Sequence, residues 1–508
     1  MADIVREIEQ KYEAADDQKL PGLRKVPGVA TVVDKGSVAL DATYYDTEDR
    51  RLAADGITLR RRTGGSDAGW HLKFPVSPGV RDEIHAPLTD DLPRRLTALL
   101  RSRIRDAALL PQVRIASDRA AHQLLDADGT LLAEVSVDHV SAHRLGSSGG
   151  AEAAWTEVEA ELGADQDPAV LKAIGKRLRK AGLTPARTAS KLARALTETA
   201  PPGGETTWQP HRAVGEHGTA GAAVLEYVTT QADALVTLDP AVRRDLPDSV
   251  HQMRVATRRM RSAFKSYRKV LDRAVTDPIG AELKWLAAEL GIDRDREVLT
   301  DRIRAAVEEL PRPLVAGPVR GRIRTWSSAR RQGSRRHIIA VLDSRRYLEL
   351  LAAVDGLLAG PPLRKAAARP APDVLTKAIL DDFGRVAALI ETALAEPPGP
   401  ERSTAMHEAR KCAKRARYAA ELARPVLGKA AKNFAGDMTT LQELLGDHQD
   451  SVVVREALRD IAAQAAAAGE SAFTYGVLYG REEARAADRE RELPGLWAEV
   501  GTPEVRRG

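Results

Sequence analysis

The stretch REIEQKYEA, residues 6 to 14, gives the first indication of the fold of the first part of this chain. It places three charged residues at every second position, which are Glu7, Glu9 and Lys11, and the residue between the two acids is the apolar Ile8. Side chains at positions i, i+2 and i+4 project from the same face of a β-strand. The stretch therefore predicts a strand with one charged face and one apolar face.

Charged or polar residues alternate in the same way in five further segments of the first 200 residues. These residues are Arg60 and Arg62; His71 and Lys73; Arg81 and Glu83; Glu134, Ser136 and Asp138; and Glu157, Glu159 and Glu161. For any one strand, the pattern is typical of an ordinary sheet with one wet face. Because six strands separate acids from bases, we favour a closed antiparallel β-barrel in which acidic strands face basic strands across the lumen.

The rest of the chain differs in composition and periodicity, and 508 residues are too many for one ordinary domain. The segment 198–221 is rich in Pro, Gly and Thr and lacks periodicity, whereas Ala, Leu, Arg and Glu recur at helical spacing beyond it. We therefore expect a two-domain α+β protein. It would have a barrel domain over residues 1–200, a linker over 201–220 and an all-helical domain over 221–495.

The helical part repeats itself. HQMRVATRRMR, starting at His251, matches HEARKCAKRAR, starting at His407, at an offset of 156 residues. Segments containing Gly291 and Gly446 follow at an offset of 155. Two signatures that keep nearly one offset predict duplicated helical halves packed about a pseudo-twofold axis. These halves would cover about 221–358 and 373–495.

The net charge of +5 hides three strongly basic windows: 251–273 carries +7, 320–346 carries +8 and 402–417 carries +5. Local fields of that size attract a polyanion. In the first and third windows the bases follow a 3,4 spacing, which forms one stripe along a helix. Solvated helix faces would explain either stripe alone, but paired stripes at one offset favour a binding groove. The stripes are His251, Arg254, Arg258, Arg261 and Lys265, and His407, Arg410, Lys414 and Arg417.

Composition and motifs exclude several classes of protein. The single cysteine, Cys412, excludes an intramolecular disulfide and cysteine metal clusters. No apolar run approaches the roughly 20 residues needed to cross a bilayer, and the N-terminus lacks the features of a secretory signal. Neither a P-loop nor an HExxH zinc motif is present. We therefore expect a soluble cytoplasmic protein with no membrane partner.

The strand motifs stand in an order that resembles the CYTH domain, the triphosphate tunnel metalloenzyme family. The order is Glu7-x-Glu9-x-Lys11, YYDT (44–47), LRRR, WHLK, VD (137–138), EVEAEL and SK (190–191). The resemblance covers residues 1 to about 200 and implies metal-dependent hydrolysis of a triphosphate, with Mg²⁺ or Mn²⁺ as cofactor. It does not distinguish inorganic, thiamine and nucleoside triphosphates, and some family members have adenylate cyclase activity.

The resemblance also implies roles for individual residues. Glu7, Glu9 and Lys11 would be catalytic. The metal ligands would be Glu7, Glu9, Asp138, Glu157 and Glu159. The triphosphate would be bound by Lys11, Arg60, Arg62, Lys73, Arg119 and Lys191, with Arg81 and Arg114 as further candidates.

The paired basic stripes and the two LG segments resemble the CHAD domain, the conserved histidine α-helical domain, over roughly residues 212–495. This resemblance implies that both stripes bind inorganic polyphosphate. A cytoplasmic protein of this kind could associate with polyphosphate granules. Few aromatic residues interleave with the bases, which disfavours single-stranded nucleic acid. The leading hypothesis is thus a triphosphatase with a polyphosphate-binding domain. Its rivals are a non-catalytic polyphosphate-binding protein and a nucleic-acid-binding protein.

Overall fold

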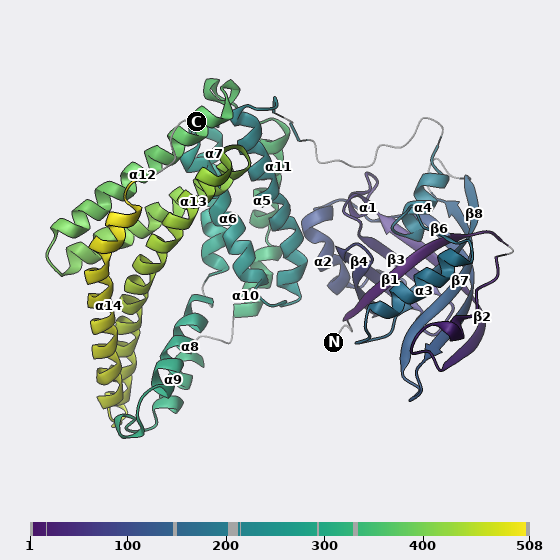
Figure 1. Ribbon diagram of the computed structural model, residues 1–508, viewed down its shortest axis with the longest axis horizontal. Coiled ribbons are helices and arrows are strands. Elements are labelled where there is room, and N and C mark those ends of the chain that lie inside the picture. The colour runs from purple at the N-terminus through teal and green to yellow at the C-terminus, as the bar shows by residue number, and fades with distance from the viewer. Residues whose placement is uncertain are drawn as a thin grey trace. The chain divides into compact units, whose positions relative to one another are not determined.

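The computed structural model describes residues 4–16, 18–145, 150–201, 212–213, 215–291, 294–328 and 334–503. The chain divides into two compact units, Met1–Gln209 and Pro210–Gly508 (Figure 1). Much of the expected linker, residues 202–211 and 214, lies outside the described residues, as do residues 146–149. No helix in the described ranges is both long enough and apolar enough to cross a membrane.

The first unit is built on one antiparallel sheet that closes into a ring. Its order is β5-β4-β3-β2-β6-β7-β8-β1-β9, and a further pairing of β5 with β1 joins the ends. This confirms the expected closed antiparallel barrel. The strands are β1 (Ile4–Ala14), β2 (Thr31–Asp46), β3 (Thr58–Thr63), β4 (Gly69–Ser77), β5 (Val80–Pro87), β6 (Leu110–Leu125), β7 (Leu131–Arg144), β8 (Glu152–Leu162) and β9 (Thr184–Pro185).

Helices cover the outside of the ring and close one end of it. α2 (Arg94–Ile104) packs on the outward apolar residues of β3, β4 and β5, and α3 (Ala169–Lys180) packs on those of β1, β7 and β8. α4 (Lys191–Glu198) instead packs against inward-facing residues such as Val113 and Trp155. It therefore plugs one end of the ring. The remaining short elements are η1 (Leu23–Lys25) and α1 (Arg51–Ala54).

The second unit is all-helical, as expected, and has two apolar cores. The larger core joins α5, α6, α7, α10, α11, α12, α13 and the end of α14. The smaller core joins α8 and α9 to the last part of α13 and the first part of α14. The helices are α5 (Ala220–Arg243), α6 (Ser249–Ser266), α7 (Arg273–Glu289), α8 (Arg294–Glu308), α9 (Val319–Ser328), α10 (Ser334–Asp343), α11 (Arg345–Ala359), α12 (Ala371–Ala395), α13 (Pro400–Ala467) and α14 (Phe473–Val500), with η2 (Arg312–Leu314) and η3 (Lys365–Ala368).

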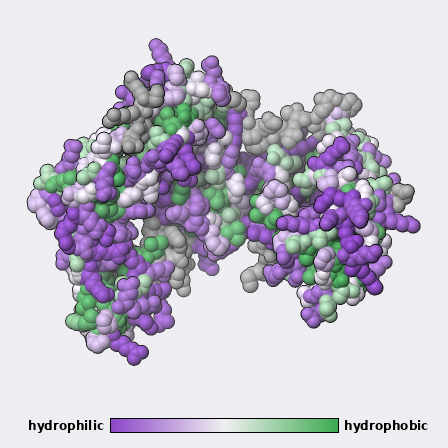
Figure 2. Space-filling view, in the orientation of Figure 1, coloured by the Kyte–Doolittle hydropathy of each residue, from purple (hydrophilic) through white to green (hydrophobic). Residues whose placement is uncertain are grey.

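The duplication is visible in the helices themselves. The segment 267–272 separates α6 from α7, and at the offset of 156 it corresponds to 423–428 within α13. That part of α13 contains Pro425 and a kink at Gly428, where φ is 56° and ψ is −125°. α13 is thus the second copy of α6 and α7, joined by a kink. The visible face of both units is mostly hydrophilic, with small separate apolar patches (Figure 2).

Candidate active site in the strand ring and candidate anion site on the helices

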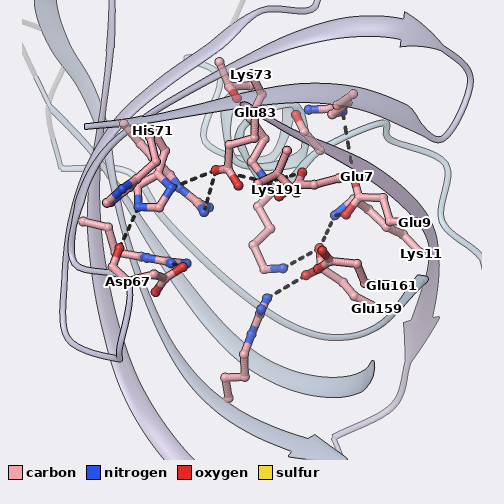
Figure 3. Close-up of a pocket in the computed structure, with 18 of the residues that line it drawn as sticks. Glu7, Glu9, Lys11, Asp67, His71, Lys73, Glu83, Glu159, Glu161 and Lys191 are labelled. Carbon is pink, nitrogen blue, oxygen red and sulfur yellow. Dashed lines mark hydrogen bonds and ion pairs between the residues drawn. The ribbon is translucent and has the colours of Figure 1, made fainter. Parts of the chain in front are cut away.

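The ring encloses a cavity of about 420 Å³ that is lined by charged side chains of most of its strands (Figure 3). The alternation in the sequence produces it, because every lining residue of a given strand comes from the inward-facing set of that strand. The acids lining it are Glu7, Glu9, Asp67, Glu83, Glu134, Glu159 and Glu161, and the bases are Lys11, Arg60, Arg62, Lys73, Arg81, Arg119 and Lys191, with Val5, Tyr44, Thr58, His71, His85 and Ser190.

Three buried carboxylates, those of Asp138, Glu157 and Glu159, have oxygens within 4.8 Å of one another. Strand register brings them together, because Asp138 on β7 is the partner of Glu157 on β8 and Glu159 is two residues further along. Hard oxygen ligands of this kind suit Mg²⁺ or Mn²⁺. The donor set therefore fits a divalent cation.

Lys191 already places an ammonium group among these carboxylates. Its Nζ lies 3.0 Å from Asp138, 2.8 Å from Glu157 and 2.7 Å from Glu159. Lys191 is the first residue of α4, whose N-cap Ser190 accepts a hydrogen bond from the N–H of Ala193 at 3.1 Å. Helix capping therefore fixes where this lysine enters the ring.

Other bases complete the charge balance around the three carboxylates. Arg119 donates to both oxygens of Asp138 at 2.8 Å and to Glu159 at 2.6 Å, and Lys11 also pairs with Glu159. Burial favours a lower pKa for Lys191, but Glu159, Asp138 and Glu157 outweigh it, so the pKa of Lys191 is raised. Burial likewise favours a higher pKa for Glu159, but the neighbouring bases hold that pKa well below its usual value. Lys191 and Glu159 are therefore both ionised at neutral pH.

Glu7 and Glu9 line the same cavity but do not belong to this group of three. Glu7 accepts two hydrogen bonds from Lys73, at 2.6 and 2.8 Å, on the β4 side. Burial, together with a hydrogen bond to Glu83, raises the pKa of Glu7 to about 8. Glu9 lies 3.0 Å from Lys11 and 3.9 Å from Arg81. Glu7 thus pairs with a base of β4, whereas Glu9 shares Lys11 with Glu159 of the three-carboxylate group.

The remaining basic side chains contact neighbouring polar and acidic groups. Arg60 donates to the hydroxyl of Tyr44 at 3.3 Å and lies 3.9 Å from Glu83. Burial, with Arg60 and Arg119 nearby, lowers the pKa of Arg62 to about 10. Arg62 also pairs with Asp67, so these bases have acidic or polar neighbours within the ring.

One sequence expectation needs correction. Arg114 was expected to bind substrate, but it points away from the cavity, is 60% exposed and pairs with Asp41 on the outside of the ring. It lies five residues before Arg119 on β6, and an odd spacing puts two residues on opposite faces of a strand. Conversely, Tyr44 and His85 line the cavity although the sequence analysis did not select them. The register of Tyr44 opposite Arg60 identifies it, and no local pattern does so.

The two basic stripes of the helical unit converge on Lys414. Burial lowers the pKa of Lys414 to about 8, and Arg258, Arg410, Arg417 and Arg254 lower it further. These bases come from α6 and from the first part of α13, whose helices pack against each other. The duplicated stripes therefore form one cluster of positive charge. Burial also lowers the pKa of His407, and His251 lies half-buried on α6.

Two glycines make room for the arginines of this cluster. A Cβ on Gly291 would lie 2.7 Å from Nη2 of Arg254, and one on Gly446 would lie 3.3 Å from Nε of Arg410. Each guanidinium therefore occupies space that a side chain would fill. The same arrangement in both halves explains why the glycine and arginine signatures keep one offset.

Comparisons with known proteins bear on both units. Residues 5–196 match the CYTH domain and residues 226–459 match the CHAD domain. Two uncharacterised proteins of Mycobacterium tuberculosis, from strains CDC 1551 and H37Rv, are each 37% identical over 505 residues, covering 96% of this chain and 94% of theirs.

Two solved structures resemble the chain more distantly. PptA from Streptomyces chartreusis is 18% identical with a TM-score of 0.45, and the alignment covers 55% of this chain and 99% of that one. The CHAD domain of the plant Ricinus communis is 22% identical with a TM-score of 0.44, covering 58% and 97%. The domain matches confirm both resemblances read from the sequence. The chain therefore belongs to the family of proteins in which a CYTH domain is followed by a CHAD domain.

Proposed function

We propose that the strand ring hydrolyses a phosphoanhydride bond of inorganic triphosphate or another triphosphate with Mg²⁺ or Mn²⁺, and that the helical unit binds inorganic polyphosphate. The observation that carries the first part is the enclosed cavity, where bases from five strands and the plug helix surround one space that also contains carboxylates. Such a space suits a chain of phosphates, because arginine and lysine bind its oxygens while carboxylates retain a cation.

The chain's own residues would divide the work between binding and orientation. Arg60, Arg62 and Lys73 on neighbouring strands would hold phosphate oxygens and oppose the charge that develops during transfer. Asp138, Glu157 and Glu159 would hold a divalent cation, which when bound polarises the phosphate and an attacking water. Because Lys191 pairs with all three carboxylates, its ammonium would have to move toward the substrate oxygens when the cation enters.

Phosphate release from tripolyphosphate in the presence of Mg²⁺ or Mn²⁺ tests this proposal. β3 offers a matched set of variants: Arg60 and Arg62 point into the cavity, whereas Arg61 between them points outward and hydrogen-bonds the carbonyl of Thr89. We expect Arg60→Ala and Arg62→Ala each to lower kcat/KM by about a hundredfold or more, because each removes charge-assisted hydrogen bonds. Arg61→Ala should retain nearly full activity. Equal losses in all three variants would refute a cavity-based reaction.

One observation favours a second candidate, a protein that binds polyphosphate without hydrolysing it. The carboxylates of the three-residue group are already paired with Lys191, Arg119 and Lys11. If wild-type protein binds tripolyphosphate but releases no phosphate with either metal, this candidate replaces the first.

The helical unit is tested separately by filter binding of long-chain polyphosphate in competition with DNA and RNA. The convergence of both stripes at Lys414 supports polyphosphate, since guanidinium groups bind phosphate oxygens without reading bases. We expect Arg258→Ala to weaken polyphosphate binding. Preference for nucleic acid over polyphosphate at one salt concentration would overturn this assignment.

A further inference from the structure

The helical unit contains a cavity of about 1020 Å³ between the end of α6 and the first half of α12. η3 and Pro503 contribute to its edge. None of the residues that converge on Lys414, namely Arg254, Arg258, Arg410 and Arg417, lines it. Lys265, the last member of the α6 stripe, does line it. The α6 stripe thus ends at a space distinct from the charge cluster.

Positive charge predominates in this cavity. Its acids are Asp373, Asp381 and Asp382, and its bases are Lys265, Arg268, Lys269, Arg369, Lys377 and Arg385. Lys269 is 3.3 Å from Asp381 and Arg385 is 2.5 Å from Asp382, so these two bases are already neutralised. Among the described residues, the other four bases form no ion pair or hydrogen bond through their side chains. Within the described part of the chain, four cationic groups therefore line this cavity outside any ion pair.

The floor of the cavity is ordered without a ligand. Asp382 is 1% exposed and accepts hydrogen bonds from Ser266 at 2.5 Å and from Arg415 at 3.0 Å, besides its pair with Arg385. This buried network fixes the end of α6 against α12 and leaves the four remaining bases at the rim. A preorganised floor lowers the cost of ordering on binding.

The cavity also has an apolar wall, formed by Val270, Val374, Ala378 and Leu380. Leu380 remains 39% exposed beside this charged rim. Cavities of several hundred Å³ that combine apolar walls with a few convergent polar groups are typical of small-molecule sites. The combination fits a ligand with several negative charges at one end.

The duplication does not account for this site. At the offset of 156, Lys265 corresponds to Glu421 and Lys269 corresponds to Pro425, and only Arg268 has a basic counterpart, Arg424. The rest of the α6 stripe, in contrast, repeats its charge in the second half. A feature that breaks the pseudo-twofold symmetry is not part of a groove that uses both halves equally.

We propose that this cavity binds a compact phosphorylated small molecule, whose phosphates contact Lys265, Arg268, Arg369 and Lys377. Guanidinium and ammonium groups at this density match a group of two or three phosphates. The source of the phosphates is either a free inorganic oligophosphate or a nucleotide, whose base would lie on the apolar wall. The proposal is independent of hydrolysis in the strand ring.

Titration calorimetry on the full chain tests it, in an Arg60→Ala background that weakens binding in the strand ring. The pocket variant is Arg369→Ala with Lys377→Ala, and the matched control is Arg364→Ala with Lys365→Ala, two neighbouring exposed bases that do not line the cavity. The probes are tripolyphosphate, adenosine triphosphate and adenosine. All four substituted side chains are exposed, so both proteins should melt like their parent.

We expect the pocket variant to bind a phosphorylated probe at least about tenfold more weakly than the control, since two charge-assisted contacts are lost. Long-chain polyphosphate binding should change less than about twofold, and adenosine alone should not bind. Tighter binding of adenosine triphosphate than of tripolyphosphate would support a nucleotide ligand, and the reverse would support an inorganic one. Equal affinities in pocket variant and control, or no heat with either phosphorylated probe, would overturn the proposal.

Discussion

Replacing Lys191 by methionine tests the electrostatics of the strand ring directly. The wild-type ammonium lies 2.7 to 3.0 Å from three carboxylates, and Asp138 among them is fully buried. Lys191→Met keeps most of the side-chain volume but removes the charge. Arg119 and Lys11 remain, so the three carboxylates lose one of the three cations that compensate them.

The expected loss of stability is large. Removing one partner of a buried ion pair typically costs about 3–5 kcal/mol, because the other charge stays buried without compensation. For a unit the size of Met1–Gln209 this corresponds to a fall in melting temperature of roughly 6–20 °C. A divalent cation bound between the carboxylates would replace the lost charge, and binding to the folded state alone raises its stability.

Thermal melts with and without Mg²⁺ or Mn²⁺ measure both effects. Lys172→Met on α3 is the control, since Lys172 is exposed on the outside of the ring. We expect Lys191→Met to melt lower than wild type in a chelator and to gain more stability from metal than wild type does. The reasoning is refuted if the variant melts like Lys172→Met, or if metal stabilises it no more than wild type.

Three further predictions concern both units. Because burial raises the pKa of Glu7 to about 8, the folded chain holds the proton of the Glu7 carboxyl more tightly than the unfolded chain does. The free energy of unfolding should therefore fall as the pH rises from 4.5 to about 8. In thermal melts across this pH range, Glu7→Gln should reduce the pH dependence of the free energy of unfolding by at most about 1.4 kcal/mol per pH unit. An unchanged pH dependence would contradict the raised pKa of Glu7. Gly291→Ala would place a methyl group 2.7 Å from Arg254 and should weaken polyphosphate binding about tenfold to a hundredfold. Gly446→Ala, whose methyl group would lie 3.3 Å from Arg410, should weaken binding far less. Equal effects of the two variants in filter binding would argue against the close fit at Gly291. Burial and neighbouring arginines lower the pKa of Lys414 to about 8, so polyphosphate affinity should decline as the pH rises through that value. Lys414→Arg should lessen the decline, because arginine stays charged. Identical pH profiles of wild type and variant would exclude a role for the Lys414 charge in binding.

Local patterns predicted which side chains face the cavity more reliably than they predicted contacts. The two-residue period placed Glu7, Arg60 and Lys73 on inward faces, because side-chain direction along a strand depends only on position. Arg114 shows the limit: the resemblance implied that it binds substrate, although its odd distance from Arg119 puts it outside. Tyr44 was missed because only the pairing of β2 with β3 brings it to Arg60.

Two domains of different secondary-structure class and a repeated helical signature could be predicted from the chain order, because periodicity and repeats are properties of that order. Which charges meet depends on the packing of distant segments. Lys191 enters the three-carboxylate group because α4 packs into the end of the ring. The cavity beside Lys265 likewise exists only because α12 packs against the end of α6. Contacts between residues far apart in the chain depend on register and packing, which no local pattern encodes.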